Sequence, residues 1–426
     1  MPDSPHTIVC PDCRHVHESW NADTEYFGCS ECASWFQKKD GRFVKLLRNA
    51  KATTSPVLEP GETGIIDGQE YRMMGFAQRN EPGQPERWQE YWLKDVLTGK
   101  TVWLSEYNGH WLFVQNIPET ELTPELKKQL EEDKIAVYQN EDFELFTEYK
   151  AVYYHLSGEF PYDPTTEKAV VCREYIAPPL LLALENDQGD KDYSISRYMR
   201  PRDMKKAFNL KYYLPIREGV SPAQPFSRWF TSGEVIVTAL IFCAIVFIAQ
   251  YFYASNAMYK EVYSHVVQVN DSTVAKPIVS PSFEITGGVS NLEVSSYAIL
   301  SNNWVEAAID LVNEQTGEEK SFATGVEYYH GVDGGESWSE GSMGTKELLC
   351  TVEPGRYHMV VNLFKDQSVD GAELNIVLRQ DVATWWNALW AMGIMAGFAA
   401  IVFAWENNFE KNRWYNSPFT TYTYDE

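Results

Sequence analysis

The chain has 426 residues and a mass of 48.9 kDa, enough for roughly two or three ordinary domains. Its 60 acidic and 36 basic residues give a net charge of −24, which argues against a general nucleic-acid binder, because phosphate binding needs clustered lysine and arginine. An aromatic content of 14% and a hydrophobic content of 44% argue against disorder. The composition therefore predicts a folded, acidic protein of several domains.

Four of the seven cysteines lie close to the N-terminus, in the pairs CPDC and CSEC. Cys10, Cys13, Cys29 and Cys32 have the spacing C-x2-C-x15-C-x2-C, which can place four thiolates around one Zn²⁺ ion. Residues 1–48 are therefore predicted to form a zinc ribbon whose structural metal stabilises the fold. The alternative, disulfides or free thiols, is disfavoured by a cytoplasmic location. We expect His15 and His17 to be surface residues rather than ligands.

A β-rich body is predicted at residues 57–215, in two halves at 57–118 and 143–215. Short runs of bulky residues, separated by turns that contain glycine, indicate a small antiparallel barrel or sandwich. A helix is predicted between the halves at 119–135, where Thr123 can cap and Pro124 can occupy the first position. A short helix is expected after Arg200.

Catalytic patterns are weak in this body. An acid–aromatic dipeptide occurs three times, as Glu90-Tyr91, Glu106-Tyr107 and Glu174-Tyr175. The three carboxylates could line one pocket, but simple strand alternation, with one residue in and one out, is the favoured interpretation. His110 and His155 lack partners for a triad, and no GxSxG, HExxH or Walker motif occurs. We predict no catalytic residue and no enzymatic activity.

Two long uncharged runs, at residues 235–259 and 383–405, follow a linker at 216–232. Both are long enough to cross a bilayer as helices, and aromatic residues flank them, so transmembrane helices are predicted at 233–254 and 383–405. The alternative is a pair of buried core helices. In the second run, Gly393 and Gly397 form a GxxxG pair that suits packing on the first helix or on a second copy in a homo-oligomer.

The loop between these runs, residues 255–382, is strongly acidic. Residues 254–382 hold 19 acidic and 7 basic residues, a net charge of −12. Alternating apolar residues at 277–380 predict an antiparallel β-sandwich. The longest irregular stretch, 327–345, combines aromatic and acidic residues, and it is interpreted either as a site for a sugar, Ca²⁺ or a partner or, preferably, as a hairpin loop.

The predicted topology places both termini in the cytoplasm and the loop 255–382 outside it. The first residues lack the apolar core of a signal peptide, and the four paired cysteines suit a reducing compartment. Cys350 has no other cysteine in the loop with which to pair, Cys243 lies in the first run, and Cys172 is expected to be buried. Residues 406–426 would form an aromatic tail that contacts either a partner or the bilayer interface.

Several motifs of the β-rich body resemble a bacterial family, domain of unknown function 4178. They include IIDGQEYRMMGF, RWQEYWL, VWLSEYNGHW, SGEFPY and EYIAPPLLLALE, and the resemblance covers roughly residues 57–215. The resemblance, in a form with a zinc ribbon and a membrane anchor, implies a role in the bacterial envelope or in a stress response. It assigns no catalytic residue.

The whole chain is thus predicted to be a mainly β, multidomain protein of the bacterial inner membrane. Its predicted function is that of a non-enzymatic scaffold or sensor that recruits cytoplasmic or membrane proteins, with structural zinc and no nucleic acid. The alternative is a membrane-tethered enzyme whose active site, in the cytoplasmic β domain, is not recognisable from the sequence.

Overall fold

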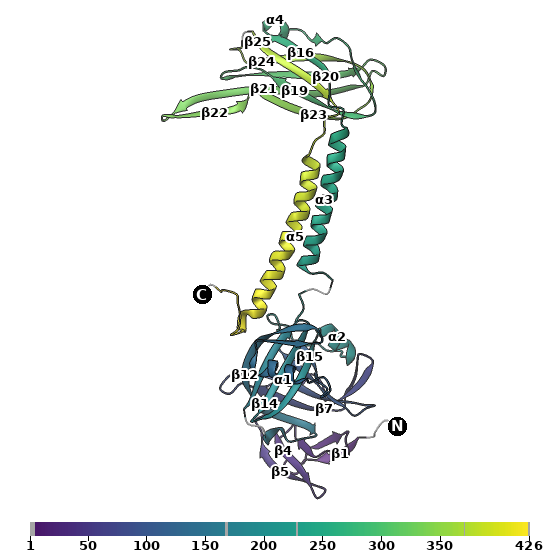
Figure 1. The fold of residues 1–426 in the computed structure, drawn as a ribbon, viewed down its shortest axis with the longest axis vertical. Coiled ribbons are helices and arrows are strands. Elements are labelled where there is room, and N and C mark those ends of the chain that lie inside the picture. Colours follow the sequence, from purple (N-terminus) through teal and green to yellow (C-terminus); the bar gives the residue numbers. More distant parts are fainter. Residues whose placement is uncertain (1–4, 167–168, 227–228, 370, 425–426) are drawn as a thin grey trace. The chain divides into compact units, whose positions relative to one another are not determined.

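The computed structural model describes residues 5–166, 169–226, 229–369 and 371–424. The chain divides into two compact units, the first comprising Met1–Glu234 with Ile401–Glu426 and the second Val235–Ala400. Strands dominate both units, and several separate sheets are formed (Figure 1). The chain is therefore mainly β, as predicted, and each unit is described by itself.

The first unit begins with five short strands in the cysteine-bearing segment, residues 5–48. A two-stranded sheet is formed by β1 (His6–Val9) and β2 (Val16–Ser19). The other three strands, β3 (Tyr26–Gly28), β4 (Ser34–Lys39) and β5 (Arg42–Arg48), pair in order, and β3 also pairs with β12 (Glu141–Phe160) of the following domain. This segment therefore extends the sheet of its neighbour.

Eight strands of the first unit pair in a closed ring. The ring runs through β7 (Gln69–Asn80), β8 (Trp88–Asp95), β9 (Thr101–Tyr107), β10 (His110–Asn116), β15 (Asp190–Met199), β14 (Leu180–Asp187), β13 (Val170–Ala177) and β12. It closes because β12 pairs with β13 through its first part and with β7 through residues 152–158. The arrangement is an antiparallel barrel, which leaves no free edge between its first and last strands.

Three glycines mark the place where the cysteine-bearing segment joins the barrel. Gly158 on β12 pairs with Gly28 on one side and with Gly75 on the other. A Cβ atom on Gly28 would lie 2.5 Å from the carbonyl oxygen of Leu156, and one on Gly158, where φ is +86°, would lie 2.5 Å from that of Met74. Only glycine permits so close an approach of the three backbones.

The barrel consists of two halves with the same order of elements. Each half starts with a short strand, β6 (Thr63–Ile66) or β11 (Ile135–Tyr138), that forms a hairpin with a long one, β7 or β12, and three further strands follow. The first half lies within the stretch 57–118, whereas the second half starts at Ile135, before the stretch 143–215. Because β7 and β12 pair with each other, and β10 with β15, the two halves together close the ring.

One helix lies beside each half. The first, α1 (Pro124–Glu132), is capped by Thr123, whose side chain accepts a hydrogen bond from the backbone N–H of Leu126, as predicted. The second, α2 (Pro201–Ala207), follows Arg200, also as predicted. Leu126 and Leu130 of α1 pack in one hydrophobic cluster and Met204 of α2 in another. Both clusters lie on the same face of the sheet, around Tyr175 and Tyr91 respectively.

Two helices are long and apolar enough to span a membrane: α3 (Ser232–Asn256) and α5 (Trp386–Arg413), the latter running into a 3-10 turn at Trp414–Asn416. Large apolar side chains such as Leu240, Ile245 and Ile394 are exposed along them, which argues against the alternative of buried core helices. The second helix continues to Arg413, beyond the predicted end at residue 405.

Two sheets of the second unit pack around one hydrophobic core. The first sheet contains β16 (Lys260–Val269), β25 (Ala372–Gln380), β19 (Ser290–Tyr297) and β23 (Gly344–Val352). The second contains β17 (Ile278–Val279), β24 (Gly355–Lys365), β20 (Asn303–Asn313), β21 (Glu319–Asp333), β22 (Glu336–Ser342) and β18 (Phe283–Ile285). Residues of both sheets, among them Val294 and Ile309, share the core, so this unit is a β-sandwich.

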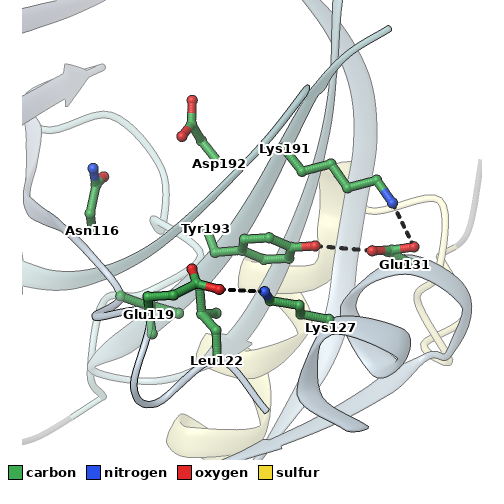
Figure 2. Close-up of a pocket in the computed structure, with 9 residues that line it drawn as sticks. Asn116, Glu119, Leu122, Lys127, Glu131, Lys191, Asp192 and Tyr193 are labelled. Carbon is green, nitrogen blue, oxygen red and sulfur yellow. Dashed lines mark hydrogen bonds and ion pairs between the residues drawn. The ribbon is translucent and has the colours of Figure 1, made fainter. Parts of the chain in front are cut away.

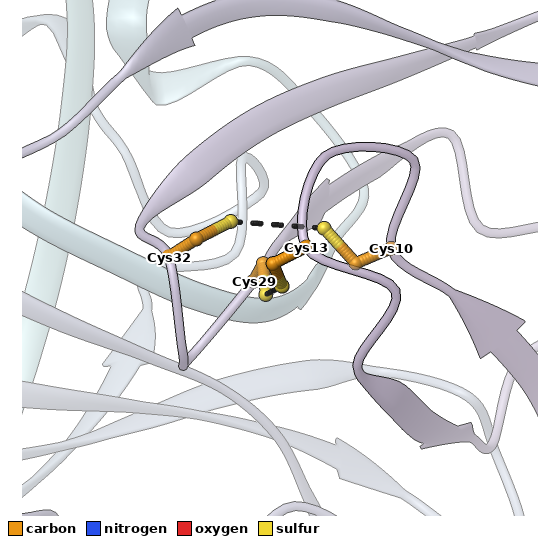
Figure 3. A group of neighbouring side chains, drawn as sticks. All are labelled: Cys10, Cys13, Cys29 and Cys32. Atoms are coloured by element: carbon orange, nitrogen blue, oxygen red, sulfur yellow. Dashed lines mark hydrogen bonds between the residues drawn. The ribbon is translucent and has the colours of Figure 1, made fainter.

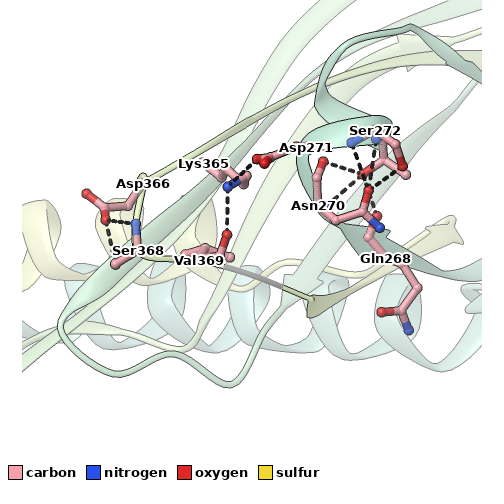
Figure 4. A network of polar contacts seen from close by, with 9 residues as sticks. Gln268, Asn270, Asp271, Ser272, Lys365, Asp366, Ser368 and Val369 are labelled. Atoms are coloured by element: carbon pink, nitrogen blue, oxygen red, sulfur yellow. Dashed lines mark hydrogen bonds and ion pairs between the residues drawn. The ribbon is translucent and has the colours of Figure 1, made fainter.

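A short helix, α4 (Asp271–Val274), follows β16 at one corner of this sandwich. Asn270 caps it by accepting from the backbone N–H groups of Ser272 and Thr273, and the side chain of Thr273 accepts in return from the N–H of Asn270. Lys365 of β24 holds the corner in place through an ion pair of 2.9 Å with Asp271 (Figure 4).

The stretch 327–345 is not irregular. Its residues belong to the end of β21, to β22 and to the start of β23, and β21 and β22 pair from Glu327–Ser342 to Asp333–Glu336. Every residue of β22, ESWSEGS, is exposed. Because neither face of this strand is buried, the sequence lacks the alternation of apolar and polar residues that marks a half-buried strand.

Candidate functional sites

The four N-terminal cysteines meet at one point. Cys10 and Cys13 lie in the turn between β1 and β2, and Cys29 and Cys32 in the turn between β3 and β4. Their sulfur atoms all lie within 4.8 Å of one another (Figure 3). The closest pairs, Cys10–Cys32 and Cys13–Cys29, are 3.7 and 3.6 Å apart, so the four cysteines are free thiols rather than disulfides.

Both cysteine turns have the same backbone geometry. Each ends on a residue with positive φ, Arg14 at 66° and Ala33 at 56°. The N–H of that residue donates to the carbonyl oxygen of the first cysteine of its pair, Cys10 or Cys29. Two equivalent turns that point four sulfurs at one place can hold a metal ion, which is the arrangement that the spacing predicts.

His17 also reaches this cluster. Its Nε2 atom lies 3.2 Å from the sulfur of Cys29, and its ring packs edge-on against Phe27. Burial lowers the pKa of His17 to about 4, so the neutral ring can donate an N–H to the sulfur. The expectation that His17 is a surface residue is therefore wrong, because its ring is half-buried beside the cluster. The pairing of β1 with β2, which no local pattern reveals, brings residue 17 back beside the second cysteine pair.

A second group of interacting side chains lies on the face of the barrel sheet opposite Tyr91 and Tyr175. It comprises Arg79, Trp88, Glu90, Tyr149, Cys172, Glu174 and Glu185 and is called the polar centre below. Arg79 is 3% exposed and donates from Nη1 to Glu90 at 3.2 Å and to Glu185 at 2.9 Å. Its Nη2 atom donates to the other oxygen of Glu185 at 3.1 Å.

The polar centre faces the inside of the ring. Arg79 on β7 and Glu185 on β14 are separated by β12 and β13 in the strand order, and side chains so far apart can meet only on a concave face. Helices α1 and α2 cover the opposite face. Glu90 and Glu185 nevertheless keep 16% and 36% of their side-chain surface exposed, so water reaches the centre.

Two carboxyl groups of the polar centre have raised pKa values. Arg79 bonds Glu90 and Glu185, whereas Glu174 accepts from the hydroxyl of Tyr149 at 2.8 Å. Burial raises the pKa of Glu174 to about 6 and also raises the pKa of Glu90. Burial raises the pKa of the Cys172 thiol as well, which makes it an unreactive neutral group.

Strand alternation and a shared pocket of carboxylates, the two interpretations of the repeated acid–aromatic dipeptide, both apply. Tyr91 and Tyr175 are fully buried in the cores of the two halves, while Glu90 and Glu174 point the other way, as strand alternation requires. Yet Glu90 and Glu174, from equivalent strands of the two halves, also converge in the polar centre. Glu106 does not belong to it: its carboxylate accepts from the N–H of Gly109 at 2.7 Å.

The two histidines of the barrel each have a separate backbone partner. His110 bonds the hydroxyl of Tyr198 at 3.0 Å and the carbonyl oxygen of Glu218 at 3.1 Å. His155 bonds the carbonyl oxygen of Ala50 at 2.9 Å. Burial lowers the pKa of both rings. These contacts give both histidines structural roles.

An outer cavity of about 510 Å³ lies between α1 and the start of β15 (Figure 2). Lys127 is paired there with Glu119 at 2.7 Å, and Lys191 with Glu131 at 2.8 Å. Glu131 also accepts from the hydroxyl of Tyr193 at 2.9 Å. These charged groups are paired with one another, as in an ordinary network of surface ion pairs. The cavity therefore does not have the features of a site for a charged ligand.

Gly393 and Gly397 are exposed, and the side on which a Cβ atom would stand is open. A Cβ atom added to either glycine would meet no atom within 4 Å among the described residues. Helix α3 contacts α5 beside Gly393, where the sulfur of Cys243 lies 3.9 Å from the carbonyl oxygen of Met392. It also contacts the residues just before α5: Gln250 donates to the carbonyl oxygen of Thr384 at 2.9 Å, and the rings of Phe247 and Trp385 are 5.7 Å apart.

Residues 59–201 match the model of the family described as Domain of unknown function (DUF4178). This part of the chain is a DUF4178 domain. The match contains every strand of the ring and the whole polar centre, and it confirms the family that the sequence motifs suggest. The cysteine-bearing segment, the two apolar helices and the sandwich lie outside the DUF4178 domain.

The other comparisons add little to the DUF4178 assignment. None of the curated proteins matches the chain. The solved structures that match include one of infectious bursal disease virus strain Gt, which is 9% identical over 88% of this chain and 69% of its own, with a TM-score of 0.17. PNGF-II is 8% identical over 73% and 67%, with a TM-score of 0.17, and a fructofuranosidase from Schwanniomyces occidentalis is 9% identical over 88% and 70%, with a TM-score of 0.16. Scores this low carry no argument about fold or function.

Proposed function

We propose that the protein is a scaffold or sensor of the bacterial inner membrane, with a zinc ribbon and the DUF4178 domain in the cytoplasm and the acidic sandwich outside. Two transmembrane helices, α3 and α5, would anchor it. The ribbon and the DUF4178 domain would recruit a cytoplasmic or membrane partner, and the sandwich would contact a component of the envelope. Zinc would have a structural role, because four cysteines leave no ligand position for water.

One observation carries this proposal: the chain segments on both flanks of the helix pair join the same domain. Arg413, at the end of α5, donates from Nη1 to the carbonyl oxygens of Ser221 and Pro222, which precede α3, at 3.0 and 2.6 Å. Trp414 and Ser417 then contact Phe146 of the barrel. Such closure requires the chain to leave the barrel and return to it, as a two-pass anchor does.

The topology can be tested by thiol labelling in spheroplasts. Cys350 is exposed and is the only cysteine of the sandwich. A membrane-impermeant maleimide should label Cys350 in intact spheroplasts. The matched control is Tyr213→Cys in a Cys350→Ser background, at a side chain of the first unit that is 96% exposed, and it should react only after lysis. The reverse pattern would refute the proposed orientation.

Recruitment can be tested by purifying the tagged full-length protein in mild detergent, with mass spectrometry and metal analysis. One protein copurifying at near-stoichiometric yield is the expected result. A preparation that contains zinc but no partner would contradict the scaffold proposal.

The second candidate function is a membrane-tethered enzyme, and the polar centre is the observation that favours it. Two carboxyl groups with raised pKa values beside an arginine are typical of acid–base sites. If Glu90→Ala and Glu174→Ala leave the cellular function unchanged in a folded protein, the enzyme hypothesis fails. Glu106→Ala, on the opposite face, is the matched control.

A further inference from the structure

The barrel has an apolar layer next to the polar centre, on the same face of the sheet. Ile176 and Ala183 lie two residues from Glu174 and Glu185 on the same strands, so their side chains point the same way. Phe146, Leu181 and Tyr198 complete this layer, with Leu112 packed against it. The layer therefore closes one end of the polar centre.

Residues from outside the barrel strands cover this apolar layer. Ala223, in the segment that leads to α3, is fully buried in it. Trp414, just past the end of α5, packs against it, and the Trp414 and Phe146 rings are 5.3 Å apart. Ser417, which is also buried, donates from its hydroxyl to the carbonyl oxygen of Phe146.

Arg413 fixes these covering residues to each other. Its side chain is 1% exposed, and besides the carbonyl oxygens of Ser221 and Pro222 it bonds both carboxylate oxygens of Glu410, at 2.8 and 3.0 Å. The arginine thus links the last turn of α5 to the residues immediately before Ala223. Further along, Phe419 packs against the core of the second barrel half. Residues 413–419 of the tail are therefore held by contacts with their own chain.

We propose that residues 413–419 form a strap that closes the apolar end of the barrel interior, shields Cys172 from that end and couples this closure to α5. Because α5 is one continuous helix from Trp386 to Arg413, a rotation or shift of the helix acts directly on Arg413 and Trp414. Loss of their contacts uncovers the apolar layer and exposes Cys172 from that side, whereas Glu90 and Glu185 are partly exposed even with the strap in place. This device does not depend on the proposed recruitment of a partner, since it concerns contacts within the first unit alone.

Cys172 provides a probe for this proposal. Its thiol belongs to the polar centre and is 1% exposed, so a small thiol reagent can reach it only when the barrel opens. In the full-length protein in detergent, the modification of Cys172 by methyl methanethiosulfonate would be followed by peptide mass spectrometry. Trp414→Ala, and separately Arg413→Ala, should speed it about tenfold or more. The matched control is Tyr213→Ala, which removes an exposed aromatic ring elsewhere in the first unit and should leave the rate unchanged.

Two further measurements on the same samples, the thermal midpoint and the modification of Cys10, distinguish global unfolding from strap release. The thermal midpoint and the modification of Cys10, buried in the distant cysteine cluster, should stay as in the wild type when only the strap is released. Faster modification of Cys172 together with an unchanged Cys10 supports the proposal. A Cys172 rate within twofold of the control in a folded variant refutes it, as does equal acceleration at both cysteines.

Discussion

Arg79 and Glu185 form a two-point ion pair between the two halves of the barrel. The Nη1–Oε1 and Nη2–Oε2 distances are 2.9 and 3.1 Å, and Arg79 lies on β7 of the first half while Glu185 lies on β14 of the second. Fork-to-fork geometry makes such a pair both strong and selective. The two halves are thus joined by an ion pair with a buried arginine as well as by strand pairing.

Replacement of Arg79 by methionine should destabilise the barrel strongly. The substitution keeps most of the apolar volume but leaves Glu90 and Glu185 without their cation. Breaking a fully buried pair costs about 3–5 kcal/mol, and the 36% exposure of Glu185 should keep the loss at the lower end of that range or below it. Chemical unfolding of the full-length protein in detergent measures the loss. Arg197→Met is the control, because it removes an ion pair with Asp67 whose side chains are 43% and 68% exposed, and it should cost less than about 1 kcal/mol. Equal effects of the two substitutions would contradict this assignment.

Stability should fall as the pH rises through the titration of Glu174. Its folded pKa of about 6 lies above the usual value of 4.5, so between these values the folded state holds a proton that the unfolded state has lost. The free energy of unfolding should therefore decrease from pH 4.5 to pH 6 and level off above it, by at most about 2 kcal/mol for this group. Glu174→Gln should remove this decrease.

The measurement of stability against pH needs a control carboxyl group in the same sheet as Glu174. Glu141→Gln changes an exposed side chain at the start of β12 and should leave the pH dependence as in the wild type. If Glu174→Gln and the wild type lose stability in parallel between pH 4.5 and pH 6, the decrease belongs to another group.

Local signals of the sequence predicted the elements that depend on neighbouring residues. The cysteine spacing predicted the cluster, Thr123 and Pro124 predicted the start of α1, and the uncharged runs predicted the two long helices. Each of these signals is contained in a short stretch of chain. The residues that cause the structure are therefore the same ones that form the pattern in the sequence.

Contacts between distant strands were beyond such signals. Closure of the ring depends on the pairing of residues 75–80 with 152–158, and no local pattern encodes that register. The polar centre follows from the closure, since Arg79 meets Glu185 only in the closed barrel. The tail illustrates the same limit: its aromatic residues predicted an interface, but the partner of Trp414 is Phe146 of the same chain.

Removal of the Glu159 carboxylate should detach the cysteine-bearing segment from the barrel. This buried group accepts from the Ser19 hydroxyl at 3.0 Å and from the Trp20 N–H at 2.7 Å, and it contacts the hydroxyl of Thr24. Glu159→Ala removes the acceptor of the Trp20 N–H and leaves the hydroxyls of Ser19 and Thr24 only the carbonyl oxygen of Asn21, at a cost of about 1–3 kcal/mol. Limited proteolysis should then cut more quickly within residues 49–57, which connect the segment to the barrel. Protection equal to that of the wild type would show that the strand pairing of β3 with β12 suffices for attachment.

Zinc content should show that Cys29 is a metal ligand and that His17 is only its neighbour. The proposed zinc site predicts about one zinc per chain, and Cys29→Ser should abolish it because three thiolates remain. His17→Ala should keep the stoichiometry but weaken zinc binding by about 10- to 100-fold, since it removes an outer N–H that contacts the Cys29 sulfur. Competition with a chromophoric chelator measures both effects. His15→Ala, an exposed neighbour with no contact to a described sulfur, is the matched control. If His17→Ala abolishes zinc binding as Cys29→Ser does, His17 is itself a ligand and the four-cysteine site is refuted.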